Sequence, residues 1–277
     1  MDISIRKKDL EKTLNTLLLC KSIEELESDL KKIFQYFDID QFAIMTFFDS
    51  NLTSSAGFSI PELFHTYPKE WTEHYFRSSY YYHDPLYTLV GIRLPFGWNE
   101  KSMTSLTSIQ KQLFYEAHDY NIQNGTTIPL VPLHSERTFV TVLNFEFLSA
   151  EICQVLTWAS QLYCSQKQSL ICRKTFRSLT HREQEVLFLK AKGLSIKQIA
   201  PILNISEPTI NFHLKSIRQK LGVRSSEQTL FWLGTNLGKL SQKAIHSLDV
   251  KSSSVSYTQI DNLLNDLFDC PVGHNIY

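Results

Sequence analysis

The hydrophobic positions in the first part of the chain follow two kinds of spacing. Between residues 7 and 37, leucine and isoleucine recur every three or four positions in two runs, which predicts two consecutive helices. Ser22, with Glu25 three residues later, is typical of a helix start and marks where the second helix begins. The apolar run at residues 41–49 is bounded by acidic and polar residues and predicts a buried strand.

Helical and strand-like patterns continue to alternate up to residue 170. We expect helices at residues 67–78, 106–120 and 149–170, and a strand at residues 138–148, which are rich in β-branched and aromatic side chains. Residues 126–133 predict a further strand that its prolines confine to an edge. This mixture predicts an α+β fold for the chain, with a sensor-like α/β/α sandwich first and an all-α domain after it.

The stretch after residue 178 contains only helical patterns, and its polar residues mark three short helices. Thr180, with Glu183 three positions later, opens the first helix, and Gly193 closes it. Ser195 and Ser206 are placed to cap the second and third helices, between which only a tight turn remains. This arrangement predicts a helix-turn-helix.

The third of these helices has one apolar stripe, which we expect to pack against the other two helices. Its opposite face offers amides that suit base edges, an aromatic ring that suits a thymine methyl group, and cations that suit phosphates. A recognition helix has this composition, and the alternative is an ordinary solvated face. We expect DNA contacts from seven residues: Thr209, Asn211, Phe212, Lys215, Ser216, Arg218 and Gln219.

Charge is divided unevenly along the chain, although the chain as a whole is neutral. Residues 173–243 contain thirteen lysines and arginines against four acidic residues, so this segment carries +9 and the remainder −9. Such asymmetry is typical of a nucleic-acid-binding part joined to an acidic part. We therefore expect a first domain at residues 1–170, a DNA-binding domain at residues 171–243 and a tail of unassigned role at residues 244–277.

The helix-turn-helix region resembles the output domain of LuxR-type regulators, and the matching residues extend over all three helices. The resemblance implies a transcription regulator whose third helix reads DNA. Pro201, inside the second helix, departs from the family pattern and predicts a kink there. The matching residues are Leu179, Thr180, Arg182, Glu183, Glu185, Val186, Leu187, Gly193, Ser195, Ile199, Ala200, Leu203, Ile205, Ser206, Thr209, Ile210, His213, Ile217, Lys220, Leu221 and Val223.

Aromatic residues gather in the first domain. Tyr67, Trp71 and Tyr75 are spaced four apart and so line one face of a helix, and Asp84 follows them. Such a stripe forms either part of the core or the wall of a ligand pocket. Polar groups on apolar rings, with a carboxylate close behind, suit a small amide or ester ligand.

This region resembles the autoinducer-binding domain of acyl-homoserine-lactone receptors, so the likeness spans both domains, to about residue 235. Asn121 departs from the pattern where the family usually has glycine, and the bulky run at residues 80–82 is a second departure. The matching residues are Tyr67, Pro68, Trp71, Tyr75, Asp84, Pro85, Pro95, Trp98, Gly125, Pro129 and Leu130.

The resemblance implies a role for each ligand-binding residue. Trp71 donates its indole N–H to the lactone carbonyl, and Asp84 accepts from the ligand amide N–H. Tyr67 donates to the acyl carbonyl, with assistance from Thr141. A carboxylate placed in this way discriminates against ligands that lack the amide N–H, because it is otherwise desolvated without a partner. The side chains expected to pack against the ligand or flank its acyl tail are Tyr75, Trp98, Phe42, Ile44 and Leu86.

The leading hypothesis is a ligand-responsive transcription regulator. An acyl-homoserine lactone fills the first domain and favours a homodimer, whose two recognition helices read a palindromic DNA site. The runner-up is a receptor of the same fold for another small molecule, such as a host or plant compound. Expected partners are DNA, the small-molecule autoinducer and a second copy of the chain, with RNA polymerase as a further candidate.

Two other classes of protein are weighed against this hypothesis. An enzyme acting on such lactones needs a nucleophile with a base or a metal cluster, and the sequence has neither a GxSxG motif nor grouped histidines. The five scattered cysteines include no CxxC pair, so we expect no metal and no cofactor. The intact third helix disfavours a ligand-sequestering protein that does not bind DNA. The charged amino terminus and the lack of a long apolar stretch predict a cytoplasmic protein without a signal peptide or membrane span.

Overall fold

The chain divides into two units, Met1–Gln166 and Lys167–Tyr277. The division falls inside a long helix, close to the boundary predicted at residue 170. The predicted tail at residues 244–277 lies outside the described residues, so the limits of the second domain stay a prediction. The computed structural model describes residues 12–48, 61–86, 94–99, 101–103, 105–131, 136–145, 148–223, 225 and 227–230.

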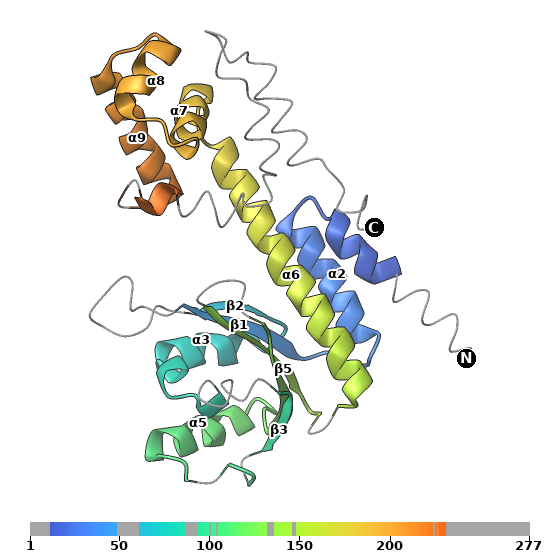
Figure 1. Cartoon of the computed structure of the whole chain (residues 1–277). Helices are drawn as coiled ribbons and strands as arrows, with labels where there is room; N and C mark the ends of the chain where they lie inside the picture. Colours follow the sequence, from blue (N-terminus) through green and yellow to red (C-terminus); the bar gives the residue numbers. More distant parts are fainter. Residues whose placement is uncertain are drawn as a thin grey trace. The chain divides into compact units, whose positions relative to one another are not determined.

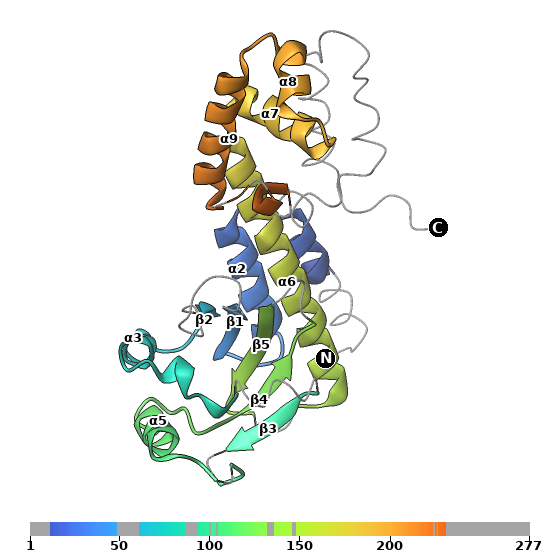
Figure 2. The same cartoon turned by 60° about the vertical axis from the view of Figure 1, so that its left-hand side comes forward.

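The first unit is a five-stranded sheet with helices on both faces (Figure 1). The helix α2 (Ile23–Gln35) and the first part of α6 (Ala150–Arg177) cover one face. The helices α3 (Lys69–Arg77) and α5 (Ser108–His118) lie on the other face (Figure 2). The predicted α/β/α sandwich is therefore confirmed. The strands pair antiparallel in the order β2-β1-β5-β4-β3 and are β1 (Phe42–Phe48), β2 (Glu62–His65), β3 (Phe96–Asn99), β4 (Asn124–Pro129) and β5 (Glu136–Leu143).

Successive residues of β1, an interior strand, face opposite sides of the sheet. Phe42 stacks on Phe34 of α2, with ring centroids 3.8 Å apart. Ile44 shares this side because residues two apart on a strand point the same way. Ala43 and Met45 therefore point toward α3 and α5. Since helices cover both faces, the strand is apolar on both sides apart from Thr46, and its sequence shows no alternation.

Most of the predicted elements of the first unit are confirmed. The strand predicted at residues 41–49 is β1, and residues 12–19 form the first of the two amino-terminal helices. Ser22 caps α2 as predicted, with its hydroxyl oxygen 3.1 Å from the backbone nitrogen of Glu25. The sequence did not predict β2 or β3, which have only four residues each.

The prediction that β4 is an edge strand is wrong. The strand lies between β5 and β3 and pairs with both. Its proline does not prevent this, because Pro129 is the last residue of the strand and its missing N–H leaves the earlier pairs intact.

The helix-turn-helix predicted for the second unit is present. Its helices are α7 (His181–Ala191), α8 (Ile196–Leu203) and α9 (Glu207–Leu221). Their amino termini are capped by the side chains of Thr180, Ser195 and Ser206, as predicted. The helix α8 continues past Pro201, whose ring is exposed. The core between the helices includes Val186, Leu187, Ile199, Ile210, Leu214 and Ile217.

Candidate functional site

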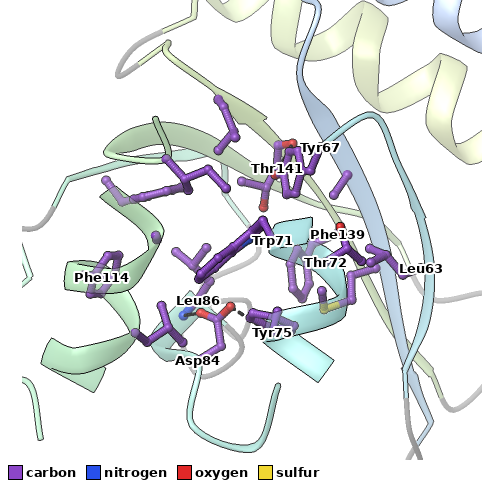
Figure 3. Close-up of a pocket in the computed structure, with 17 residues that line it drawn as sticks. Leu63, Tyr67, Trp71, Thr72, Tyr75, Asp84, Leu86, Phe114, Phe139 and Thr141 are labelled. Carbon is purple, nitrogen blue, oxygen red and sulfur yellow. Dashed lines mark hydrogen bonds between the residues drawn. The ribbon is translucent and has the colours of Figure 1, made fainter. Parts of the chain in front are cut away.

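A cavity of about 60 Å³ lies in the first unit, between the sheet and the helices α3 and α5 (Figure 3). Its wall is apolar with a few polar groups, which is the usual composition of a small-molecule site. Seven of the nine predicted ligand-binding residues line it: Tyr67, Trp71, Tyr75, Asp84, Leu86, Trp98 and Thr141. The other lining residues are Ala43, Met45, Leu63, Thr72, Leu113, Phe114, Ala117, Ile122, Phe139 and Leu143.

The helix α3 brings two of the aromatic residues to the cavity. Trp71 and Tyr75 are separated by one helical turn, and both are buried in the apolar cluster that includes Phe114 of α5. The aromatic stripe is therefore core and cavity wall at once, so the two alternatives drawn from its spacing do not exclude each other.

Asp84 presents a fixed carboxylate to the cavity (Figure 3). The Tyr75 hydroxyl donates to its Oδ2 at 2.9 Å, and the Leu86 backbone N–H donates to its Oδ1 at 2.9 Å. Burial raises the pKa of Asp84, and these two hydrogen bonds oppose that effect because they stabilise the charged form. Each carboxylate oxygen keeps a lone pair for a further donor.

Donor groups border the same cavity. Within the described part of the chain, the indole N–H of Trp71 makes no hydrogen bond. The Tyr67 hydroxyl donates to the Thr141 carbonyl at a long 3.3 Å. Burial, together with the charge of Asp84, raises the pKa of both Tyr67 and Tyr75, so both phenols stay neutral and able to donate.

The polar atoms of Trp98 and Thr141 are engaged with the sheet. The Trp98 indole N–H donates to the Thr127 hydroxyl at 3.1 Å, and that hydroxyl lies 3.0 Å from the Thr141 hydroxyl. Gly125 allows Trp98 to lie flat on β4, because a Cβ there would be 2.4 Å from the Val142 carbonyl oxygen and 2.9 Å from the Trp98 ring. Trp98 therefore offers the cavity its ring rather than its N–H.

Contrary to the prediction, two of the nine residues lie away from the cavity. Phe42 and Ile44 do not line the cavity and lie on the opposite face of the sheet, where Phe42 stacks on α2. The sequence identified the right strand but the wrong set of alternate residues. The side chains of β1 that reach the cavity are those of Ala43 and Met45.

Both departures from the family pattern have a structural explanation. Asn121 has φ 60°, the left-handed region that favours glycine and that asparagine tolerates best among the other residues. Residues 80–82 form a short 3-10 helix, η2, in which Tyr80 and Tyr81 are buried in the core beside α3. The bulky tyrosines are thus part of the core next to the cavity and do not line it.

The helix α9 presents part of the predicted DNA-reading face to solvent. Asn211, Phe212, Lys215 and Gln219 are exposed, and 68% of the Phe212 surface is accessible. Because the ring is exposed on this face of α9, it is accessible for apolar contact with a thymine methyl group. The remaining predicted residues are half-buried and are Thr209, Ser216 and Arg218.

A buried carboxylate at the start of α7 forms hydrogen bonds with two residues of α9. The sequence did not predict this connection. Glu183 is 4% exposed, and it accepts from the Ser216 hydroxyl at 2.6 Å, from the Lys220 ammonium at 2.7 Å and from the Thr180 backbone N–H at 2.6 Å. Burial raises the pKa of Glu183, but these bonds outweigh it and lower the pKa to about 2. The hydroxyl of Ser216, a residue expected to contact DNA, thus donates its hydrogen bond to Glu183.

Two findings bear on the classes of protein weighed above. Among the described residues, no group of histidine, cysteine, aspartate and glutamate is arranged to hold a metal ion. In the same part of the chain, no helix has the length and apolar character needed to cross a membrane.

Two family models match the chain. The model described as bacterial regulatory proteins of the luxR family matches residues 177–233, and the model described as autoinducer binding domain matches residues 22–146. RhlR, an HTH-type quorum-sensing regulator of Pseudomonas aeruginosa, is 32% identical over 57% of this chain and 68% of its own length. The transcriptional activator CarR of Pectobacterium carotovorum subsp. carotovorum is 25% identical over 65% of this chain and 80% of its own length.

Solved structures share the fold. The crystal structure of Escherichia coli SdiA has a TM-score of 0.53 and 20% identity over 84% of this chain and 97% of that chain. SdiA in complex with octanoyl-rac-glycerol has a TM-score of 0.52 and 20% identity over 84% of this chain and 94% of that chain. The curated relatives named above are transcription regulators and not enzymes. The chain therefore belongs to the LuxR family of transcription regulators, with an autoinducer-binding domain for a small molecule and a helix-turn-helix domain that binds DNA.

Proposed function

We propose that the small molecule is an N-acyl homoserine lactone bound in the cavity beside α3. The observation that carries this proposal is that a carboxylate and an indole N–H, from Asp84 and Trp71, border one apolar cavity. An acyl homoserine lactone has an amide N–H for the carboxylate and a ring carbonyl for the indole. Its acyl chain suits the apolar remainder of the wall, at about 0.8 kcal/mol for each buried CH₂ group.

Each polar group on the wall has one role in this proposal. Asp84 accepts from the ligand amide N–H, and Trp71 donates to the lactone carbonyl. Tyr67 exchanges its long bond to the Thr141 carbonyl for a bond to the acyl carbonyl. Tyr75 holds Asp84 in place and packs against the ligand with Trp98 and Leu86.

The volume of the cavity implies that binding rearranges its wall. Ligand pockets usually have a volume of about 300–1,000 Å³, whereas this cavity has about 60 Å³. Ligand binding therefore moves apolar side chains of α3 and α5 outward, and the free energy of that movement reduces the affinity.

A second candidate is a ligand that has an acyl chain but no lactone. SdiA, which shares the fold, has been crystallised with octanoyl-rac-glycerol. An acylglycerol has no amide N–H, and its hydroxyl groups take the place of that donor at Asp84. The two candidates therefore differ in the donor that Asp84 receives.

Calorimetric titration of the full chain with a panel of acyl homoserine lactones and with octanoyl glycerol tests these assignments. We expect a lactone to bind best, and Asp84→Ala to weaken it at least about tenfold, since a hydrogen bond to a charged group contributes about 1.5–3 kcal/mol. Tyr115→Phe, at an exposed position on α5 away from the cavity, is the matched control. Unchanged lactone affinity in the Asp84 variant contradicts the assignment of Asp84, and preferential binding of the glycerol ester favours the second candidate.

For the DNA-binding domain, we propose that two copies of the chain bind a palindromic site, each placing one α9 in the major groove. Exposed amides, a lysine and Phe212 on α9 support this role. RNA polymerase is the proposed further partner, and the cytoplasm, where DNA and polymerase are found, is the proposed location. Selection of bound sites from random DNA, followed by mass measurement of the complex, tests whether two chains bind a palindromic site. We expect an inverted repeat bound by two chains, and one chain on an unrepeated site contradicts the proposal.

A further inference from the structure

A second carboxylate, which does not itself line the cavity, connects α5 to α3 and to η2. Glu116 of α5 accepts from the Tyr80 hydroxyl at 2.6 Å, and its Oε2 lies 2.6 Å from His74 Nε2, which must carry a proton to bond a carboxylate. Its Oε1 accepts from the Gln112 side-chain amide at 2.8 Å. These bonds lower the pKa of Glu116 to about 2, because they stabilise the charged form.

The two distant partners of Glu116 lie next to the two residues that read the ligand head group. His74 follows Trp71 by one turn of α3, and their rings are 6.1 Å apart. Tyr80 is fixed to Asp84, whose backbone N–H donates to the Tyr80 carbonyl at 2.9 Å. The separation of the Trp71 indole from the Asp84 carboxylate thus depends on two segments that Glu116 holds together.

The same helix makes a second connection to this region. The Gln110 side-chain amide, near the start of α5, donates to the His83 carbonyl at 2.9 Å, directly before Asp84. Phe114 and Ala117, four and seven positions after Gln110 and so on the same face of α5, line the cavity. Movement of α5, which a ligand larger than the cavity requires, therefore strains the side-chain bonds of Glu116 and Gln110.

We propose that Glu116 is a positioning residue for ligand recognition: it touches no ligand but sets the distance between the donor of Trp71 and the acceptor of Asp84. The inference rests on the proposed function of the cavity and adds how its specificity is maintained. Loss of Glu116 then reduces discrimination between head groups more than it reduces the binding of an acyl chain.

Binding of two probes to the full chain tests this inference. The probes are N-octanoyl homoserine lactone and the ester analogue in which an oxygen replaces its amide N–H. In Glu116→Ala, the dissociation constant of the ester divided by that of the amide is expected to fall at least threefold. The main cause is that the amide probe binds more weakly. Tyr80→Phe, which keeps the ring and removes one bond, changes the ratio in the same direction with less risk to folding. Gln112→Ala is the control, because that bond lies within α5 and joins no other segment.

A purely structural role predicts a different result. If Glu116→Ala and Tyr80→Phe weaken both probes by the same factor, the inference is overturned. Hydrogen exchange of the ligand-free chain gives a second readout, in which Glu116→Ala is expected to raise exchange in residues 69–77 and 80–84 but not in α2. Equal exchange in the variant and the wild type also overturns the inference. If the wild-type chain binds neither probe, the lactone proposal fails, and the exchange experiment still decides the role of Glu116.

Discussion

The buried carboxylate of Glu183 is expected to account for much of the stability of the helix-turn-helix. In Glu183→Gln, the charged bonds to Lys220 and Ser216 are lost while the shape of the side chain is kept. The pKa of Glu183 is lowered from an ordinary 4.5 to about 2, with burial opposing the bonds that lower it. At about 1.4 kcal/mol for each pKa unit, the charged form contributes about 3 kcal/mol to the free energy of unfolding. The side chain is only 5% exposed, so solvent does not screen this interaction appreciably.

The dependence on pH follows from the direction of the pKa. Because the folded-state pKa of Glu183 is lowered, its contribution is fully present above pH 4.5 and is lost as the pH falls toward 2. Urea unfolding of the full chain, followed by circular dichroism, measures the helical transition in wild type and variant. The two should differ by about 3 kcal/mol at pH 7 and converge only as the pH approaches 2.

The matched control is Glu207→Gln, at an exposed position in the first turn of α9. A carboxylate there contributes less than about 1 kcal/mol through the helix dipole. A loss of less than 1 kcal/mol in Glu183→Gln at pH 7, or parallel pH profiles for wild type and variant, refutes the reasoning.

Three further variants test other parts of the structure. Gly125→Ala places a Cβ 2.4 Å from the Val142 carbonyl oxygen, so it should destabilise the first domain by about 2–3 kcal/mol, and an unchanged melting temperature contradicts the close approach of Trp98. Asn121→Ala should lower the free energy of unfolding by about 1 kcal/mol, measured by thermal unfolding, because φ is 60° at this position. Asn121→Gly should not lower it, and equal losses in the two variants argue against a left-handed residue. Phe212→Ala should leave the melting temperature unchanged, because the ring is 68% exposed, but should weaken binding to the selected DNA site about tenfold in a fluorescence titration; undiminished affinity removes Phe212 from the interface.

The parts of the structure that depend on local sequence were predictable. The residues Thr180, Ser195 and Ser206 cap their helices through bonds that span three residues, so the spacing alone indicates the helix starts. The same holds for Trp71 and Tyr75, whose shared helix face is set by a spacing of four. Local hydrogen bonding and helical periodicity therefore gave the helix-turn-helix and one wall of the cavity.

Features that depend on distant parts of the chain were not predictable. The first four residues of the strand with Phe42 and Ile44 are all apolar and buried, so their sequence does not say which alternate residues meet the cavity. Glu183 bonds to residues 33 and 37 positions away, and Glu116 to residues 36 and 42 positions away. No periodic pattern indicates such partners, and the bond from Ser216 to Glu183 was not predicted for the same reason.

The most direct test of the central claim is the identity of the small molecule that the cavity retains. The full chain and its Asp84→Ala variant are each expressed with a mixture of acyl homoserine lactones of different length, purified and denatured, and the released molecules are identified by mass spectrometry. The account predicts one mole of an acyl homoserine lactone per mole of wild-type chain and much less with the variant. Equal amounts from both proteins, or a retained molecule without an amide N–H, would contradict it.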